Sequence, residues 1–475
     1  MKIAIIGAGP AGITAAYKLS LSNHKVDLYE STNSVGGMAK TISLWGQLVD
    51  LGPHRFFSND PRVNKLWLEL AGKDYTMVNR LTRIYYKGKF FDYPLKPFNA
   101  LKNLGLLESI YCVFSFLIEK LFFAKSRDKS TFEGWVISRF GHRLFKIFFK
   151  SYSEKLWGIS CKDLDSDFAA QRIKKLSLYE AIKNSFFNKK TSKHKTLVDQ
   201  FAYPNKGAGA IYDKMSKNII ENGANIFFNT KILSIDDTSK ENKIDIKFND
   251  SVKSYDHVIS TMPITKLIQS MSSASKEIIS YSKKLKFRNT ILVYLRIETE
   301  ELLFPDQWIY VHASNLKTGR ITNFKNWVKS INQNSKDTII CLEYWCNLDD
   351  DFWLLNNNDY IKLAKKEILK TGLVSSENIK DGHVVRIPRC YPIYSKGYKD
   401  TLKPIQQFLI RNKMISVIGR YGAFKYNNQD HSILMGILAA ENIINNTNHN
   451  LWELNTDYEY QESSKITETG LEKLD

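Results

Sequence analysis

The sequence predicts an α/β fold: a discontinuous Rossmann-type dinucleotide-binding domain, an inserted helical region and a substrate domain built on an antiparallel sheet. Three observations support this fold class. The chain opens with a β-branched apolar run, Lys2–Ile6, which leads through a glycine-rich turn into a helical pattern. A mostly helical pattern rich in Phe, Leu and Lys fills residues 64–187. From Thr290 to Val385 short apolar runs alternate with turns, which is typical of antiparallel strands.

The chain has 475 residues, enough for more than one domain of roughly 100–200 residues. Short apolar runs at Ala224–Phe228 and Val258–Ser260 are expected to be strands that return to the first domain, and Ser416–Gly419 a last strand. We therefore expect a cofactor-binding domain of residues 1–75, 200–262 and 410–450, a mainly helical substrate or lid domain of residues 76–199, a mixed-sheet substrate domain of residues 263–409, and a loose polar tail of residues 451–475.

The chain is basic, with a net charge of +19. Lys and Arg are spread along the sequence, and neither a dense basic arm nor a nucleic-acid-binding motif is present. We therefore expect no nucleic-acid partner. A solvated basic surface, an anionic ligand and an anionic membrane surface stay open as explanations of the charge.

Cysteine usage favours a reducing compartment. The cysteines are odd in number and none has the Cys-x-x-Cys spacing, which argues against a disulfide framework and against a metal site. The N-terminus enters a strand at once, without the pattern of a signal peptide, so we expect a cytoplasmic protein. The five cysteines are Cys112, Cys161, Cys341, Cys346 and Cys390.

The most apolar stretch is Ser109–Ile118. It is too short to span a bilayer. We interpret it as a buried helix, and a helix that dips into a membrane surface is the alternative. Peripheral membrane contact therefore stays open, as does the oligomeric state.

The glycine-rich turn carries the pattern Gly7-x-Gly9-x-x-Gly12 between a strand and a helix. In such a turn the first glycine permits the tight bend, the second lets the backbone approach a pyrophosphate, and the third lets helix and strand pack closely. The amino end of the helix favours the negative charge. Glu30 ends the second strand, where a carboxylate can accept hydrogen bonds from a ribose. The sequence therefore predicts a dinucleotide cofactor.

Six residues after Glu30 comes the pair Gly36-Gly37, which resembles the extended dinucleotide motif of FAD-binding amine-oxidase-like proteins. This favours FAD over NAD, although Met38 stands where many of those proteins carry an arginine. A late helix whose amino end faces the flavin is also implied by the resemblance. The candidate FAD contacts are Gly7, Gly9, Pro10, Ala11, Gly12, Glu30, Gly36, Gly37, Met38, Gly52, His54, Gly419, Arg420, Gln429, Asp430, His431 and Ser432.

Several segments, collinear over most of the chain, resemble the UDP-galactopyranose mutases, the eukaryotic kind more than the bacterial. The last of them is the most specific, because it matches a family run of the form G-R-x-G, K-Y and N-Q-D-H-S. The segments are Asp50–Phe57, Phe132–Gly141, Tyr152–Trp157, Gln171–Ile173, Tyr203-Pro204, Arg320–Trp327, Tyr391–Ile393 and Gly419–Ser432.

This resemblance implies roles for individual residues. Arg172 and Arg320 would clamp the substrate diphosphate, since a guanidinium offers a planar fork of donors to phosphate. His54 would orient or tune the flavin. The candidate catalytic residues are therefore His54, Arg172 and Arg320. Read without the resemblance, Arg172 is a surface charge and His54 a structural hydrogen-bonding group. Tyr391, Tyr426, Asn428 and Trp157 would also contact substrate, with Trp157 equally well placed in the core.

The resemblance implies a flavin-dependent mutase that interconverts pyranose and furanose forms of a nucleotide-linked sugar for surface glycan synthesis. Reduced FAD would act as a nucleophile without net redox, and an external reductant such as NAD(P)H would maintain it. The chain departs from the mutases in the apolar, Lys-rich segment 109–129, at Ser153 and at Tyr394. An FAD-dependent oxidoreductase of the amine oxidase or protoporphyrinogen oxidase type is therefore the alternative, with a non-catalytic FAD-binding protein as a third possibility.

Overall fold

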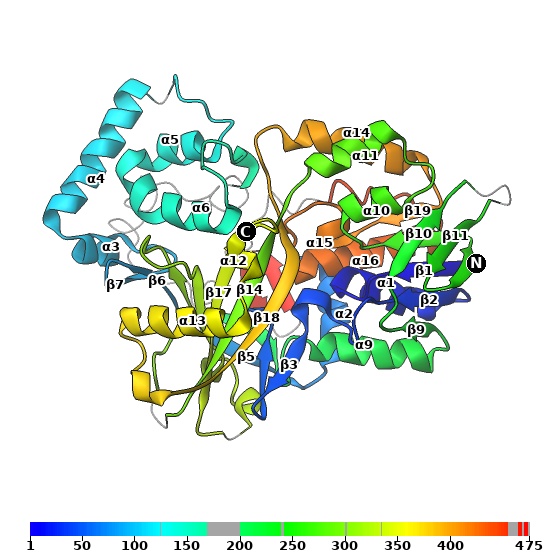
Figure 1. Cartoon of the computed structure of the whole chain (residues 1–475), viewed down its shortest axis with the longest axis horizontal. Coiled ribbons are helices and arrows are strands. Elements are labelled where there is room, and N and C mark those ends of the chain that lie inside the picture. The colour runs from blue at the N-terminus through cyan, green and yellow to red at the C-terminus, as the bar shows by residue number, and fades with distance from the viewer. Residues whose placement is uncertain are drawn as a thin grey trace.

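The computed structural model describes residues 1–123, 125–168, 200–238, 242–299, 302–333, 335–454, 464–467 and 470–473. Figure 1 shows an α/β molecule with the sheet that contains β1 and β2 at one end, helices α3 to α6 at the opposite end and a second large sheet between them. The predicted fold class is confirmed. The predicted residue Arg172 lies outside the described residues.

The first sheet is parallel, with the strand order β19-β13-β1-β2-β9 among the described residues. Its strands come from distant parts of the sequence, which confirms a discontinuous Rossmann-type unit. The two predicted returning strands both join this sheet. The strands are β1 Lys2–Ile6, β2 Lys25–Tyr29, β9 Asn225–Phe227, β13 His257–Ser260 and β19 Ile415–Val417.

Helix α1, Pro10–Ser20, lies against this sheet and packs closely on helix α16, Gln429–Ile444. The sequence permits the close approach because the contact is made by small residues. A Cβ atom on Gly436 would lie 2.4 Å from the carbonyl oxygen of Ala11. Proline at the first turn of α1 suits the start of a helix, where its missing N–H is no loss. Two segments more than 400 residues apart are thereby fixed at the cofactor site.

The larger sheet has the order β18-β14-β17-β16-β15-β6-β7 within the described part of the chain. All neighbours are antiparallel except β15 and β6, which run parallel. The predicted antiparallel sheet is confirmed. Its strands are β6 Thr82–Tyr86, β7 Lys89–Asp92, β14 Phe287–Ile297, β15 Trp308–Val311, β16 Arg320–Asn323, β17 Thr338–Cys346 and β18 Ile379–Pro392.

The helical pattern predicted for residues 64–187 is correct at its start, in α2 Pro61–Ala71, and wrong for residues 75–92. Strand β5, Tyr75–Asn79, pairs with β8, Gln200–Pro204, and β6 and β7 extend the larger sheet. These runs contain many aromatic and β-branched residues. The partner strands β8 of β5 and β15 of β6 lie more than 100 residues away, whereas β7 pairs with β6 as a hairpin. Tertiary pairing, which the local pattern does not reveal, therefore decides their conformation.

Residues 97–157 of the insert, apart from its loops, are helical where the structure describes them. This segment contains α3 Pro97–Leu104, α4 Leu106–Ile118, a π-helical turn Glu119–Phe123, α5 Phe132–Leu144, a second π-helical turn Phe145–Lys150 and α6 Ser151–Trp157. The predicted burial of Ser109–Ile118 is wrong, because only Ser109 and Cys112 of α4 are buried. None of the described helices is long and apolar enough to cross a membrane.

The remaining elements connect these layers. The expectation of a loose tail is wrong in one respect, since β20 and β21 form an antiparallel hairpin near the C-terminus. The elements are β3 Thr41–Leu44, β4 Gln47–Asp50, α2 Pro61–Ala71, α9 Ala210–Glu221, β10 Ile232–Asp236, β11 Ile244–Phe248, β12 Ser251–Tyr255, α10 Ile264–Ser270, α11 Lys276–Lys284, α12 Asp351–Leu354, α13 Asn357–Thr371, α14 Tyr398–Arg411, α15 Gly419–Gly422, β20 Ser464–Thr467 and β21 Gly470–Lys473.

Candidate active site

A cavity of about 1440 Å³ begins at the carboxyl end of β1 and reaches the larger sheet and the helical insert. Ligands of open α/β sheets bind at this edge of the strands. Of the predicted site residues, the cavity is lined by Gly7, Gly9, Pro10, Ala11, Glu30, Gly37, Met38, His54, Arg320, Tyr391, Gly419, Arg420, Tyr426, Asn428, Gln429 and Ser432. The predicted residues Gly12, Gly36, Gly52, Trp157, Asp430 and His431 are not among its lining residues.

The two glycine loops lie side by side at the start of α1. The Gly36 N–H donates to the Ala8 carbonyl at 2.8 Å, and a Cβ on Gly37 would lie 3.0 Å from the Gly9 Cα atom. No side chain caps α1, so its first backbone N–H groups are left for another acceptor. This arrangement fits the pyrophosphate of a dinucleotide, which needs close backbone approach and unpaired donors.

Gly12 packs against the glycine-rich turn on the side away from the cavity. A Cβ on Gly12 would lie 1.9 Å from the Gly7 carbonyl oxygen, and Gly7 itself has a φ of +95°. Both positions therefore require glycine for the backbone path of the turn. Gly12 shapes the cradle without lining it.

Glu30 is buried at the end of β2 and is held in a fixed orientation. Its carboxylate accepts the Ala8 N–H at 2.8 Å and the Thr32 N–H at 2.8 Å. The same side chain lines the cavity. A carboxylate fixed by backbone donors at this place fits a ribose hydroxyl as its further partner.

His54 also lines the cavity, near enough to two arginines to feel their charges. Burial, together with the positive charges of Arg320 and Arg420, lowers the pKa of His54 to about 3. The imidazole is therefore neutral at physiological pH. It can orient a ligand through hydrogen bonds but carries no charge to offer an anion.

Replacing His54 by glutamine should reduce the acid sensitivity of the fold. As the pH falls below about 6.5 the unfolded chain takes up a proton on His54, whereas the folded protein resists it until about pH 3. Between pH 7 and pH 5 the wild-type protein therefore loses about 2 kcal/mol of unfolding free energy that His54→Gln retains. Urea unfolding of both proteins at the two pH values measures this. Parallel pH profiles would contradict the lowered pKa.

Arg320 is paired with a buried carboxylate. Arg320 on β16 and Glu343 on β17 stand directly opposite each other, and the Arg320 Nε–H donates to Glu343 Oε2 at 2.7 Å. Burial opposes the charge on Arg320, but the Glu343 carboxylate overcomes it and raises the pKa of the guanidinium above its ordinary value. Only part of the donor fork of Arg320 therefore stays available to a ligand.

Glu343 also organises its other neighbours. It accepts hydrogen bonds from the Trp345 Nε1–H at 3.1 Å and from the Tyr391 hydroxyl at 3.2 Å. Sequence reasoning missed this residue, although one signal was present: Glu343 is the single charged residue in the wholly buried strand β17, Thr338–Cys346. A charge in such a strand indicates a buried partner.

Arg420, a predicted cofactor contact, packs against Tyr391 and Tyr426, which are two predicted substrate contacts. Its guanidinium carbon lies 4.7 Å from the ring centre of Tyr391 and 4.4 Å from that of Tyr426, and the two rings stack 5.5 Å apart. Its Nε–H donates to the Cys390 carbonyl at 3.0 Å. The structure therefore places a half-buried cation beside two phenols on the cavity wall.

At the start of α16 some of the predicted site residues cap the helix and others line the cavity. Asn428 and His431 form a reciprocal cap, in which the Asn428 N–H donates to His431 Nδ1 at 3.3 Å. Gln429 accepts the Tyr212 hydroxyl at 2.6 Å and lines the cavity. His431 therefore secures the amino end of the helix rather than lining the cavity.

Trp157 is a core residue. It is fully buried and its ring lies 5.7 Å from Tyr426, behind the cavity wall. Sequence reasoning gave no role to Tyr310, which lines the cavity and packs against Tyr152 at 5.6 Å. The described residues contain no cluster of His, Cys, Asp and Glu that could hold a metal ion. The five cysteines are buried free thiols.

Comparison with known proteins gives a family match over most of the chain. The family described as flavin-containing amine oxidoreductases matches residues 10–369. The coproporphyrinogen III oxidase of Staphylococcus aureus is 23% identical over 288 residues, which cover 55% of this chain. The matched region spans only 60% of the length of that enzyme.

Solved structures of similar fold include a reduced UDP-galactopyranose mutase, with a TM-score of 0.80 and 22% identity over 96% of this chain and 97% of the mutase. A protein from Exiguobacterium sp. 255-15, named as a suspected protoporphyrinogen oxidase, has a TM-score of 0.72 and 14% identity over 94% of this chain and 99% of its own. At such identities the likeness establishes the fold alone.

Proposed function

Because the chain belongs to the family of flavin-containing amine oxidoreductases and binds FAD, we propose that it is a mutase that interconverts pyranose and furanose forms of a nucleotide-linked sugar. The observation that carries this proposal is the inner end of the cavity. There, Arg320 and Arg420 stand among tyrosines on a wall that continues from the FAD cradle. Glu343 neutralises the guanidinium of Arg320 and His54 is neutral, so among these groups the positive charge of Arg420 remains.

This charge balance fits an anionic substrate. A diphosphate brings negative charge into the cavity, and guanidinium and phenol groups are donors that phosphate oxygens accept. An apolar electron donor would gain nothing from such groups and would leave their donors unpaired. Tyr152, Tyr310, Tyr391 and Tyr426 supply the hydroxyl groups around the two arginines.

In this proposal the cradle of Gly9, Gly37 and the start of α1 holds the FAD pyrophosphate, and Glu30 holds its ribose. Reduced FAD, when bound, supplies a nucleophile toward the anomeric carbon without net oxidation of the sugar. Arg320 and Arg420 stabilise the charge of the diphosphate as it leaves that carbon and hold it nearby for its return. An external reductant such as NAD(P)H keeps the flavin reduced.

The direct test uses the purified FAD-bound protein, reduced with dithionite, and a panel of UDP-sugars that includes UDP-galactopyranose. We expect pyranose–furanose exchange, resolved by chromatography, with at least one member of the panel. No exchange with any sugar, together with bleaching of oxidised flavin by a coproporphyrinogen-like donor, would replace the proposal by an oxidase function.

A conservative substitution tests the diphosphate site. Arg320→Lys should weaken UDP binding by about ten- to hundredfold, because lysine cannot reproduce the planar fork that reaches Glu343 and phosphate together. The FAD content should not change, since Arg320 lies at the substrate end of the cavity. Arg296→Lys, a partly exposed arginine paired with Asp381, is the matched control and should bind UDP normally. Loss of FAD from Arg320→Lys would refute the assignment.

One observation favours an oxidoreductase as the second candidate. The cavity continues into an apolar arm lined by Ile84, Leu95, Ala100, Leu144 and Phe148, where a large apolar substrate would fit. The family match and the relation to coproporphyrinogen III oxidase are compatible with that chemistry. The polar inner end weighs only against an apolar substrate, because binding such a substrate requires no cations.

A further inference from the structure

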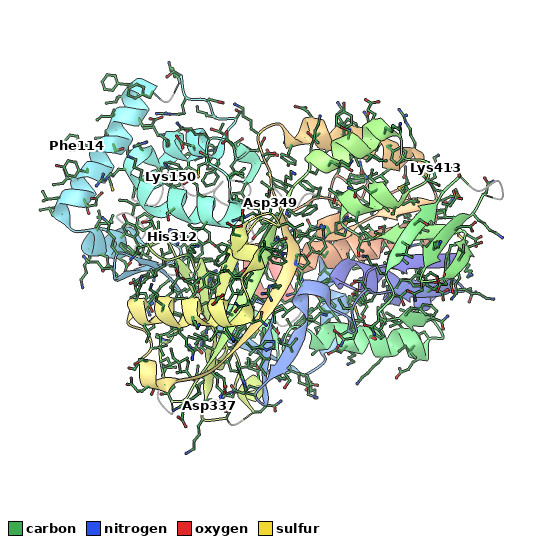
Figure 2. The ribbon with its side chains drawn as sticks, in the orientation of Figure 1. Phe114, Lys150, His312, Asp337, Asp349 and Lys413 are labelled. Atoms are coloured by element: carbon green, nitrogen blue, oxygen red, sulfur yellow. The ribbon has the colours of Figure 1, made fainter. Side chains whose placement is uncertain are left out.

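Helix α4 and the π-helical turn after it carry an exposed apolar face, here called the docking face and defined as the exposed apolar side chains of residues 106–123. Leu106 is 77% exposed and Phe122 73%, and Leu107, Tyr111, Phe114 and Leu121 are exposed to a similar degree. Spacings of three and four residues place them along one side of the helix. Figure 2 shows Phe114 at the edge of the molecule, away from the sheets.

An apolar surface of this extent is rare on a protein that stays in water. The face does not belong to the protein core, because α4 buries only Ser109 and Cys112. It also stands apart from the cofactor cavity, whose lining includes no residue of α4. No described residue covers the outer side of this face, which leaves it open to a partner.

The charges around the docking face are cationic. Its two acidic side chains are neutralised by arginines outside α4: Glu108 pairs with Arg143, and Glu119 with Arg127. Exposed lysines border the face at both ends of the segment and within the turn, at Lys102, Lys120 and Lys125. A leucine- and phenylalanine-rich helix face bordered by lysines complements a lipid surface that carries negative headgroups.

A small groove of about 470 Å³ opens beside the face. Apolar side chains of Tyr111, Phe114, Ile118 and Phe123 line it, and Arg127 and Arg143 stand at its border. The groove therefore has apolar walls, and its guanidinium groups are already paired with Glu119 and Glu108. An acyl chain is the kind of ligand that suits such apolar walls.

We propose that the docking face inserts into the headgroup and acyl boundary of an anionic lipid bilayer, with α4 lying in the plane of the membrane. Helix α3 is common to this face and to the cavity, since Ala100 lines the apolar arm while Leu101 and Lys102 are exposed. Membrane docking thus brings the apolar arm close to the lipid surface. This inference does not depend on which reaction the cavity performs.

The test is co-sedimentation of the FAD-bound protein with large vesicles of phosphatidylcholine, with or without phosphatidylglycerol. We expect binding to the anionic vesicles, weaker binding to the neutral ones, and release from the anionic ones at high salt. Leu107→Glu combined with Phe114→Glu should lower the bound fraction by about tenfold or more. Lys120→Glu combined with Lys125→Glu should lower binding to anionic vesicles only.

The matched control is Leu354→Glu combined with Ile410→Glu, since both residues are highly exposed on other elements. This variant should bind vesicles as the wild type does. Flavin absorbance and the melting temperature verify that each variant is folded. Equal sedimentation of the wild type and the Leu107/Phe114 variant, or no binding to anionic vesicles, overturns the proposal. A dimer in solution that these two substitutions dissociate also overturns it, because the face would then be covered by a second copy.

Discussion

Glu343→Gln lowers the free energy of unfolding by about 3–5 kcal/mol, the cost typical of breaking a buried ion pair. Glu343 is 3% exposed and accepts hydrogen bonds from Arg320, Tyr391 and Trp345. The glutamine amide is uncharged, and its NH2 group brings two further donors. The neighbours Arg320, Trp345 and Tyr391 already donate hydrogen bonds to this position. Arg320 is then a buried cation without a counter-charge. Chemical denaturation monitored by tryptophan fluorescence measures the loss.

The control for this variant is Glu298→Gln. Glu298 forms an exposed ion pair with Lys380, and exposed pairs contribute little to stability. Its denaturation midpoint should match that of the wild type. A Glu343→Gln protein as stable as this control would mean that Arg320 finds another acceptor or draws water into the cavity.

Gly9→Val yields a folded protein that purifies without FAD. Gly9 has an ordinary negative φ of −69° at the amino end of α1, so valine fits the backbone. Its Cβ would lie 3.9 Å from the Gly37 Cα atom, and the added methyl groups would enter the gap between the two glycine loops. That gap is where the backbone must approach the pyrophosphate. The ratio of flavin absorbance to protein absorbance measures the loss.

The melting curve separates loss of cofactor from loss of fold. Gly9→Val should melt cooperatively at the temperature of wild-type protein stripped of FAD, and added FAD should not raise it. Gly12→Val should fail to fold, because its Cβ would collide with the Gly7 carbonyl at 1.9 Å. A Gly9→Val protein that retains bound FAD would place the pyrophosphate elsewhere.

Predictions succeeded where residues close in sequence make the feature. The turn from Gly7 to Gly12 and the acid at Glu30 lie within 24 positions, and their spacing alone fixes a strand, a helix start and a second strand. Residues such as Met38 and Gly37 line the cavity for the same reason. Local backbone geometry decides these contacts, so the sequence reveals them.

Predictions failed where a distant partner decides the environment. Residues 82–86 were expected to be helical, yet β15 lies more than 200 residues away and pairs with them as a strand. The apolar stretch 109–118 was expected to be buried, yet nothing described in the chain covers its outer side. Apolar character predicts that a surface will be covered, and does not say whether the chain itself or an external partner covers it.

The sequence by itself determined that this protein carries a Rossmann-type cradle for FAD, because a short glycine pattern imposes its own backbone path. Only the tertiary structure decided which charges stand at the inner end of the cavity. Strand register sets Glu343 opposite Arg320, and the fold brings Arg420 onto the rings of Tyr391 and Tyr426. Pairing between strands is a long-range property, and the charge that remains for a substrate depends on it.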